Sequence, residues 1–201
     1  MAVPWLMLVL AGVVAASPLY VKRGPVPDPL PATPDPSVAL PSALEKAAGH
    51  PLALGARLRI STTQGAITVV LFPAEAPSYT RHFLKEVDFG TFTSEGFWRI
   101  ASSYVQLGAP DTDVDNGSGT HSYALMPTTF DHNRLPQLAG ALVMDRAFSQ
   151  DATPAFVRHR YGIVKEDGAG FPGTVIGQVI EGLDVARRLG PRDAIHGITL
   201  I

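Results

Sequence analysis

The chain has no cysteine, little net charge and no cluster of basic residues, and each shortage excludes a class of function. Without cysteine it has no disulfide, no thiol nucleophile and no cysteine-bound zinc. Charged residues make up 17% of the 201 residues and the formal net charge is -2, so nothing favours nucleic acid as a partner. The hydrophobic fraction of 46% instead indicates a globular domain with a substantial core.

Motifs for hydrolysis and metal binding are also missing. No serine lies in a nucleophile-elbow sequence, and the histidines lack metal-ligand spacing. The run Asp111 to Gly117 has aspartates at calcium-loop positions one, three and five, but its glycine falls one place late and Ser122 replaces the bidentate glutamate. We therefore expect no metal or other cofactor and interpret this run as a solvated loop, with a calcium-dependent surface module as the less favoured alternative.

The first 23 residues form a segment with a membrane-type composition. Residues 2–21 are almost uninterruptedly apolar and are followed by Lys22 and Arg23. Such a run just crosses a hydrocarbon core of ~30 Å, so we expect 1–23 to be a transmembrane anchor or a cleaved signal peptide. A buried helix is less favoured because the run has no polar face. The expected location is either a membrane, to which a single-pass N-terminal anchor would hold the chain, or the secretory pathway. The sequence does not decide the orientation of the anchor.

Residues 24–56 are rich in proline and alanine. Dense proline favours extended polyproline II segments, so we interpret this stretch as a semi-rigid spacer. One short helix is expected from Ser42 to Ala48, because Ser42 suits the cap and Glu45 completes a capping box. A proline-rich ligand for a partner domain is the alternative.

From Arg57 to Ile201 the pattern indicates a third region, made of short strands and two helices. Alternating apolar residues on both sides of a turn at 63–65 predict an opening hairpin. One helix is expected to begin with Ser78 as its cap and to end at Gly90, and a second to span 183–189. Many short strands with two separated helices are typical of a mainly β, antiparallel barrel.

The stretch 97–110, FWRIASSYVQLGAP, contains the most informative charge. Read with period two, Phe97 and Arg99 share one face of a strand. Arginine is rarely buried unless it is paired or aimed at a ligand. The alternative is an arginine at a sheet edge with its head group in water.

Motifs in a fixed order surround Arg99. An AP-x-x-x-x-x-F-L helix starts at Ala76, FWRI matches F-H-R-V, and QLGAP at 106–110 matches QGGDP; Gly117 and Gly119, GALVM at 140–144 and TVIGQVIEG at 174–182 follow. This ordered set, over about residues 57–201, resembles the cyclophilin family of peptidyl-prolyl isomerases. The resemblance implies a closed eight-stranded antiparallel β-barrel with one helix covering each end.

The resemblance also implies a catalytic role for Arg99. Amide resonance sets a barrier of ~18–20 kcal/mol to rotation about an X-Pro bond. Twisting localises the nitrogen lone pair, to which a fixed guanidinium donates a hydrogen bond, so the twisted amide is stabilised without a covalent step. By resemblance, the substrate-binding residues are Phe97, Tyr104, Gln106, Met144, Phe156 and Phe171, with Phe97 beneath the arginine and Met144 on the pocket floor.

The chain departs from the family pattern where the G-S-Q-F-F-I strand is expected. A gapless reading from Met144 puts 155–157 on Q-F-F, whereas reading back from Thr174 puts Arg160, Tyr161 and Gly162 there. The backbone-binding glutamine is lost in the first register and becomes an arginine in the second. Residues 99–106 are also one residue shorter than the usual pattern.

These observations predict a peptidyl-prolyl cis-trans isomerase acting on X-Pro bonds of protein substrates, with weakened activity. The alternative is a catalytically inactive cyclophilin-like domain that binds proline-containing segments as an interaction module. The expected partners are proline-containing proteins or peptides and a membrane contacted through residues 2–21. The domain is expected to be a monomer.

Overall fold

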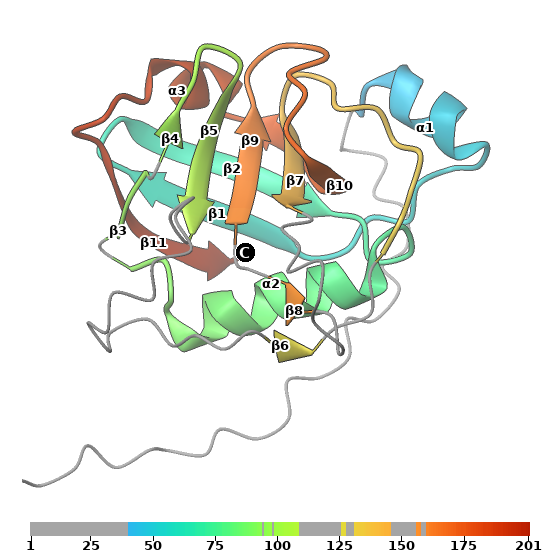
Figure 1. Cartoon of the computed structure of the whole chain (residues 1–201), viewed down its shortest axis with the longest axis horizontal. Coiled ribbons are helices and arrows are strands. Elements are labelled where there is room, and N and C mark those ends of the chain that lie inside the picture. Colours follow the sequence, from blue (N-terminus) through green and yellow to red (C-terminus); the bar gives the residue numbers. More distant parts are fainter. Residues whose placement is uncertain are drawn as a thin grey trace, which may run out of the picture.

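A strongly curled antiparallel sheet is the main element of the fold (Figure 1). The computed structural model describes residues 40–93, 95–97, 99–108, 126–127, 131–145, 156–157 and 160–201. The sheet has 9 strands in the order β3-β11-β1-β2-β10-β7-β9-β5-β4. In chain order they are β1 (Arg57–Thr62), β2 (Gly65–Leu71), β3 (Glu95–Gly96), β4 (Arg99–Ile100), β5 (Tyr104–Gly108), β7 (Ala141–Asp145), β9 (Arg160–Val164), β10 (Gly173–Glu181) and β11 (Ala194–Leu200). β6 (Met126–Pro127) and β8 (Phe156–Val157) form a separate 2-stranded sheet.

The predicted mainly β, antiparallel architecture is confirmed. The opening hairpin pairs Arg57 with Val70 through Thr62 with Gly65, as the alternation predicted. The two edge strands, β3 and β4, follow each other directly in the chain. The sheet is therefore curled so strongly that both of its edges belong to one short stretch of sequence. Among the described strands the recorded pairing stops at β3 and β4, so closure into a barrel stays a prediction.

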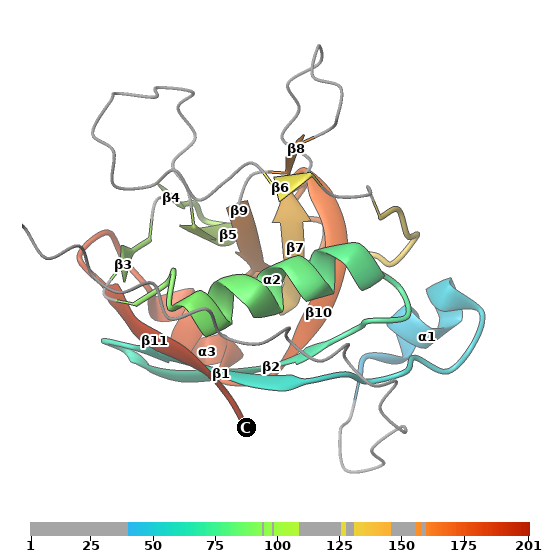
Figure 2. The same ribbon diagram turned by 90° about the horizontal axis from the view of Figure 1, so that it is seen from below.

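Two helices lie at opposite ends of the curled sheet (Figures 1 and 2). α2 (Pro77–Phe89) covers one end and turns out of the helix at Gly90, whose φ of 72° suits glycine. α3 (Leu183–Arg188) lies at the other end. The predicted cap of α2 is wrong: the N-cap is Ala76, and the carboxylate of Asp131 accepts the Tyr79 N–H at 2.7 Å. A distant loop thus satisfies a helix-terminal donor that sequence reasoning assigned to Ser78.

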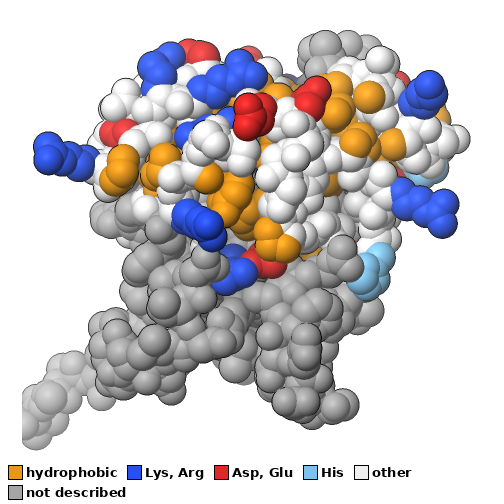
Figure 3. Space-filling model, turned by 45° about the horizontal axis from the view of Figure 1, so that its top comes forward, with side chains coloured by type: hydrophobic (Ala, Val, Ile, Leu, Met, Phe, Trp, Pro, Cys, Tyr) orange, Lys and Arg blue, Asp and Glu red, His pale blue; other side chains and the backbone are white. Residues whose placement is uncertain are grey.

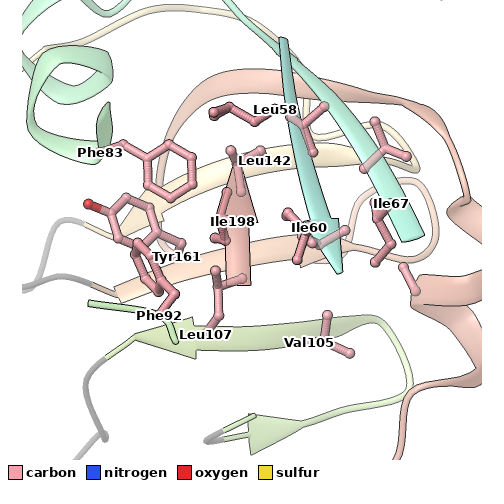
Figure 4. Packing of buried hydrophobic residues seen from close by; sticks show 14 of the residues in the cluster. Leu58, Ile60, Ile67, Phe83, Phe92, Val105, Leu107, Leu142, Tyr161 and Ile198 are labelled. Carbon is pink, nitrogen blue, oxygen red and sulfur yellow. The ribbon is translucent and has the colours of Figure 1, made fainter. Parts of the chain in front are cut away.

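The curled sheet separates two apolar cores. The inner core fills the space inside the sheet and under α2 (Figure 4), and includes Leu58, Ile60, Ile67, Phe83, Phe92, Val105, Leu107, Leu142, Met144 and Tyr161. The outer core lies on the opposite sheet face and includes Leu44, Leu52, Leu54, Val70, Phe72, Val143, Val164, Phe171 and Val175. Burial on both faces explains why β7 is apolar from Ala141 to Met144 rather than alternating.

The segment before β1 contributes to the outer core. α1 (Ser42–Ala48) has the predicted bounds, although its N-cap is Pro41 and no side chain caps it. Leu44 is fully buried, and Leu52 and Leu54 are buried with it. The last part of the expected spacer therefore packs against the sheet.

Several predicted features fall outside the described residues: the apolar segment 2–21, the first part of the spacer at 24–39, the run 111–117 and Gly119. Within the described part of the chain, no helix combines the length and the apolar character needed to cross a membrane.

Candidate functional site

The β4–β5 hairpin places Arg99 on the outer face of the sheet. Arg99 pairs with Gln106, and Ile100 pairs with Val105. Val105 belongs to the inner core and Ile100 packs against it. Because successive strand residues point to opposite faces, Arg99 and Gln106 project outward. The Arg99 side chain is exposed, whereas Gln106 is buried.

Three side chains form a stack on this outer face. The Arg99 guanidinium carbon lies 5.7 Å from the centre of the Tyr104 ring, within cation-π range. The Tyr104 ring meets the Phe171 ring edge to face, with centroids 4.9 Å apart. Phe171 is only 3% exposed. The stack therefore connects an exposed cation to a ring anchored in the outer core.

Gly162 makes room for Phe171. Gly162 pairs with Gln106 on one side and with Val143 on the other, so it occupies the middle of the outer face. A Cβ at this position would lie 2.8 Å from two atoms of the Phe171 ring. The loop residue Phe171 thus fills the space that a side chain of β9 would otherwise take.

A second arginine, Arg160, lies on the same outer face and forms an ion pair with Asp145. Arg160 is two residues before Gly162, and its Nε donates to Asp145 Oδ2 at 2.6 Å, with a further contact from Nη2. The side chains of Arg160 and Asp145 are 12% and 2% exposed. The pair therefore places a neutralised guanidinium beside the Gln106–Gly162 row.

One face of the molecule is of mixed charge (Figure 3). On the face drawn in Figure 3, basic and acidic side chains are interspersed with apolar ones. This distribution offers no single basic patch on that face.

The structure decides between the two registers that the sequence left open. β9 contains Arg160, Tyr161 and Gly162, and Tyr161 pairs with Leu107 of β5 and Met144 of β7. The reading back from Thr174 is therefore the one that the fold adopts. Phe156 lies in β8, which pairs with β6 outside the main sheet.

Two residues expected around Arg99 lie elsewhere. Met144 is fully buried in the inner core, so it faces away from Tyr104 and Phe171. Phe97 also packs in the inner core, although period two placed it on the face of Arg99. The alternation fails because β3 ends at Gly96 and β4 begins only at Arg99, so no continuous strand joins Phe97 to Arg99.

A buried polar cluster lies behind the site and was missed in the sequence. The Tyr161 hydroxyl donates to Glu86 Oε2 at 2.5 Å, and His82 Nε2 lies 3.2 Å from Glu86 Oε1. All three residues are buried. Burial, followed by the charge of Glu86 and the hydrogen bond to it, raises the pKa of Tyr161 well above 10.0. The only signal was a glutamate close to the apolar stripe of a predicted helix. Asp145 was missed in the same way, at the end of an apolar strand.

Comparison with known proteins matches most of the chain to one family. The model of the cyclophilin-type peptidyl-prolyl cis-trans isomerase family matches residues 57–194. A cyclophilin from Hirschia baltica has a similar structure at 18% identity and a TM-score of 0.53, covering 72% of this chain and 73% of that one. A cyclophilin-type peptidyl-prolyl cis-trans isomerase from Cryptosporidium parvum matches at 19% identity and a TM-score of 0.55, covering 73% of this chain and 97% of its own. A crystal structure of the latter protein in the presence of the dipeptide Ala-Pro matches at 20% identity and a TM-score of 0.55, over 72% of this chain and 98% of that one. No curated protein matches the sequence.

Proposed function

Because this chain belongs to the cyclophilin-type peptidyl-prolyl cis-trans isomerase family, we propose that it accelerates rotation about X-Pro bonds of protein substrates, with Arg99 as the catalytic residue. The observation that carries the proposal is the exposed Arg99 guanidinium, held against the Tyr104 ring and paired across the hairpin with Gln106. An arginine fixed in this way supplies directed donors at the surface without needing to lose a proton.

Each part of the site has a role in this reaction. Arg99 donates to the prolyl nitrogen as its lone pair localises, an interaction that exists only in the twisted amide and therefore lowers the barrier. Tyr104 and Phe171 supply the apolar wall for the proline ring. The family resemblance assigns the contact with the substrate backbone to Gln106, which lies buried beneath the surface.

The part of the site expected to bind the substrate, its binding half, supports a weakened activity. In the register that the fold adopts, Gly162 offers no side chain to the proline ring and Arg160 stands where a backbone-binding glutamine is expected. Because the Arg160 guanidinium already donates to Asp145, it offers a peptide backbone fewer hydrogen bonds than the amide of a glutamine would.

The test is an exchange assay of a short X-Pro peptide with the full chain, its Arg99→Ala variant and an Arg59→Ala control. Arg59 is an exposed arginine of β1 and controls for the loss of one surface charge. We expect acceleration by the wild type and by Arg59→Ala, and its loss in Arg99→Ala with an unchanged unfolding midpoint. A folded wild type that does not accelerate exchange would refute the isomerase proposal.

The second candidate function is a non-catalytic module for proline-containing segments, favoured by the missing side chain at Gly162. It predicts that proline peptides perturb the NMR resonances of Tyr104 and Phe171 although the wild type gives no acceleration. Absence of both effects would remove both candidates.

We propose in addition that residues 2–21 anchor the chain in a membrane and that the domain is a closed, monomeric barrel. The apolar run supports the anchor, and the sharing of both sheet edges by one segment supports closure. The anchored chain should stay in the membrane pellet after alkaline carbonate extraction. Recovery of a mature chain that begins near Ser17 would instead indicate secretion.

A further inference from the structure

Lys165 is a buried lysine without a carboxylate partner among the described residues. It directly follows β9 and is 7% exposed. Its Nζ donates to the backbone carbonyl of Ala101 at 3.1 Å. Desolvation lowers its pKa, so burial is costly for the charged form. An apolar side chain at this position would avoid the free-energy cost of burying a charge, which points to a role for the hydrogen bond to Ala101.

The acceptor of this hydrogen bond lies in the loop that joins β4 to β5. The Lys165 backbone N–H donates to the carbonyl of Ser103 at 2.7 Å, so one residue holds the loop at two points. Arg187 of α3 in turn donates from its Nε to the Lys165 carbonyl at 3.1 Å. The loop is thereby tied to β9 and, through Arg187, to the helix at that end of the sheet.

The pairing between β4 and β5 is short. β4 is only 2 residues long and makes just two pairings with β5. One further backbone hydrogen bond, from the Ala101 N–H to the Tyr104 carbonyl, lies inside the loop. A slip here would turn Arg99 away from the Tyr104 ring, because a shift of one residue reverses the face of a strand side chain.

We propose that Lys165 is a positioning residue whose side chain, by holding the carbonyl of Ala101, keeps Arg99 over Tyr104 in its productive geometry. Its effect on rate rests on the proposed function, while its effect on the placement of Arg99 does not. Lys165 contacts the loop and not the substrate.

The first test uses kinetics of the full chain. Lys165→Met keeps an unbranched apolar side chain and removes the donor, whereas Lys165→Arg restores a charged donor. Lys46→Met, at an exposed lysine of α1, controls for the loss of a lysine. We expect Lys165→Met to lose about tenfold or more in kcat with a smaller change in KM, because a misplaced catalytic group costs rate. Its unfolding midpoint should not fall, since a costly buried charge is removed. Lys165→Arg should recover most of the rate, and Lys46→Met should match the wild type. In an Arg99→Ala background, Lys165→Met should add no further loss, because it acts through Arg99.

The second test does not depend on activity. The Arg99 Hε proton should be shifted in the NMR spectrum by the Tyr104 ring, and this shift should disappear in Lys165→Met and persist in Lys46→Met. Lys165→Leu, which also lacks a donor, replaces Lys165→Met if the latter does not fold, with the same expected loss. An unchanged Arg99 signal in the folded variant would overturn the proposal, as would an unchanged rate in an active enzyme. If the wild type is inactive, the isomerase proposal fails and the Arg99 signal alone decides the role of Lys165.

Discussion

Gly162→Ala should destabilise the protein by forcing Phe171 off β9. The added Cβ would lie 2.8 Å from the ring, and reaching the 3.4 Å at which ordinary contact begins requires a shift of about 0.6 Å. The ring is 3% exposed and meets Tyr104 at 4.9 Å, so it has little space in which to move. Overpacking of this kind costs ~1–3 kcal/mol, against a gain of ~0.4–1 kcal/mol from restricting the unfolded chain. We expect a net loss of about 1–2 kcal/mol in the free energy of unfolding.

The matched control is Gly197→Ala in β11. An added Cβ there meets no atom within 4 Å, and neither glycine has a left-handed φ, so the two variants differ in space and not in backbone strain. Denaturant titration should show Gly197→Ala as neutral or more stable by up to ~1 kcal/mol. In the double variant with Phe171→Leu, the cost of Gly162→Ala should shrink, since the ring that blocks the methyl group is gone.

Equal tolerance of the two alanines would refute this reasoning. It would mean that Phe171 does not rest on Gly162, and the stack from Arg99 through Tyr104 to Phe171 would lose its anchor.

The remaining predictions concern the two buried polar groups. Tyr161→Phe removes the donor to buried Glu86 and should cost about 1–3 kcal/mol, whereas adding Glu86→Leu should recover most of that loss in a denaturant titration. Because the pKa of Tyr161 is raised in the folded chain, its contribution is fully present below pH 10.0 and falls as pH rises through the folded value; Tyr161→Phe should flatten that alkaline loss. Asp145→Asn removes the carboxylate that pairs with the nearly buried guanidinium of Arg160 and should cost about 3–5 kcal/mol, while Asp145→Leu with Arg160→Met should cost much less by thermal unfolding. Equal losses in the single and double variants of either pair would contradict the pairing.

The sequence predicted those parts of the fold that follow from local pattern. The hairpin of β1 and β2 and the bounds of α1 follow from apolar alternation and from local helix signals, and the structure has both. Local pattern failed at Phe97, because alternation applies only within a continuous strand and the chain leaves the sheet between β3 and β4. It also failed to show that Asp131 caps α2, since that contact spans 52 positions of the chain.

Local pattern predicted the candidate site only where its residues lie on one hairpin, whereas Phe171, which meets Tyr104 from a distant loop, was predicted from the family resemblance. Arg99, Tyr104 and Gln106 are within a few positions of each other, and strand pairing places them on one face. The contacts of Gly162 with Phe171 and of Asp145 with Arg160 join a strand to a loop and two strands to each other. They depend on the register of the chain between 145 and 174, which no local pattern fixed.

The two halves of the site should therefore fail in different ways. Under the proposed function, the donor of Arg99 is used only when the prolyl amide twists, so its loss should lower kcat. Under the same proposal, the wall made by Tyr104 and Phe171 contacts the proline ring in the planar and twisted forms alike, so weakening it should raise KM and leave kcat nearly constant. Since the departures from the family pattern at Gly162 and Arg160 fall on the binding half, the weakened activity expected of this chain should appear as a high KM with a kcat still governed by Arg99.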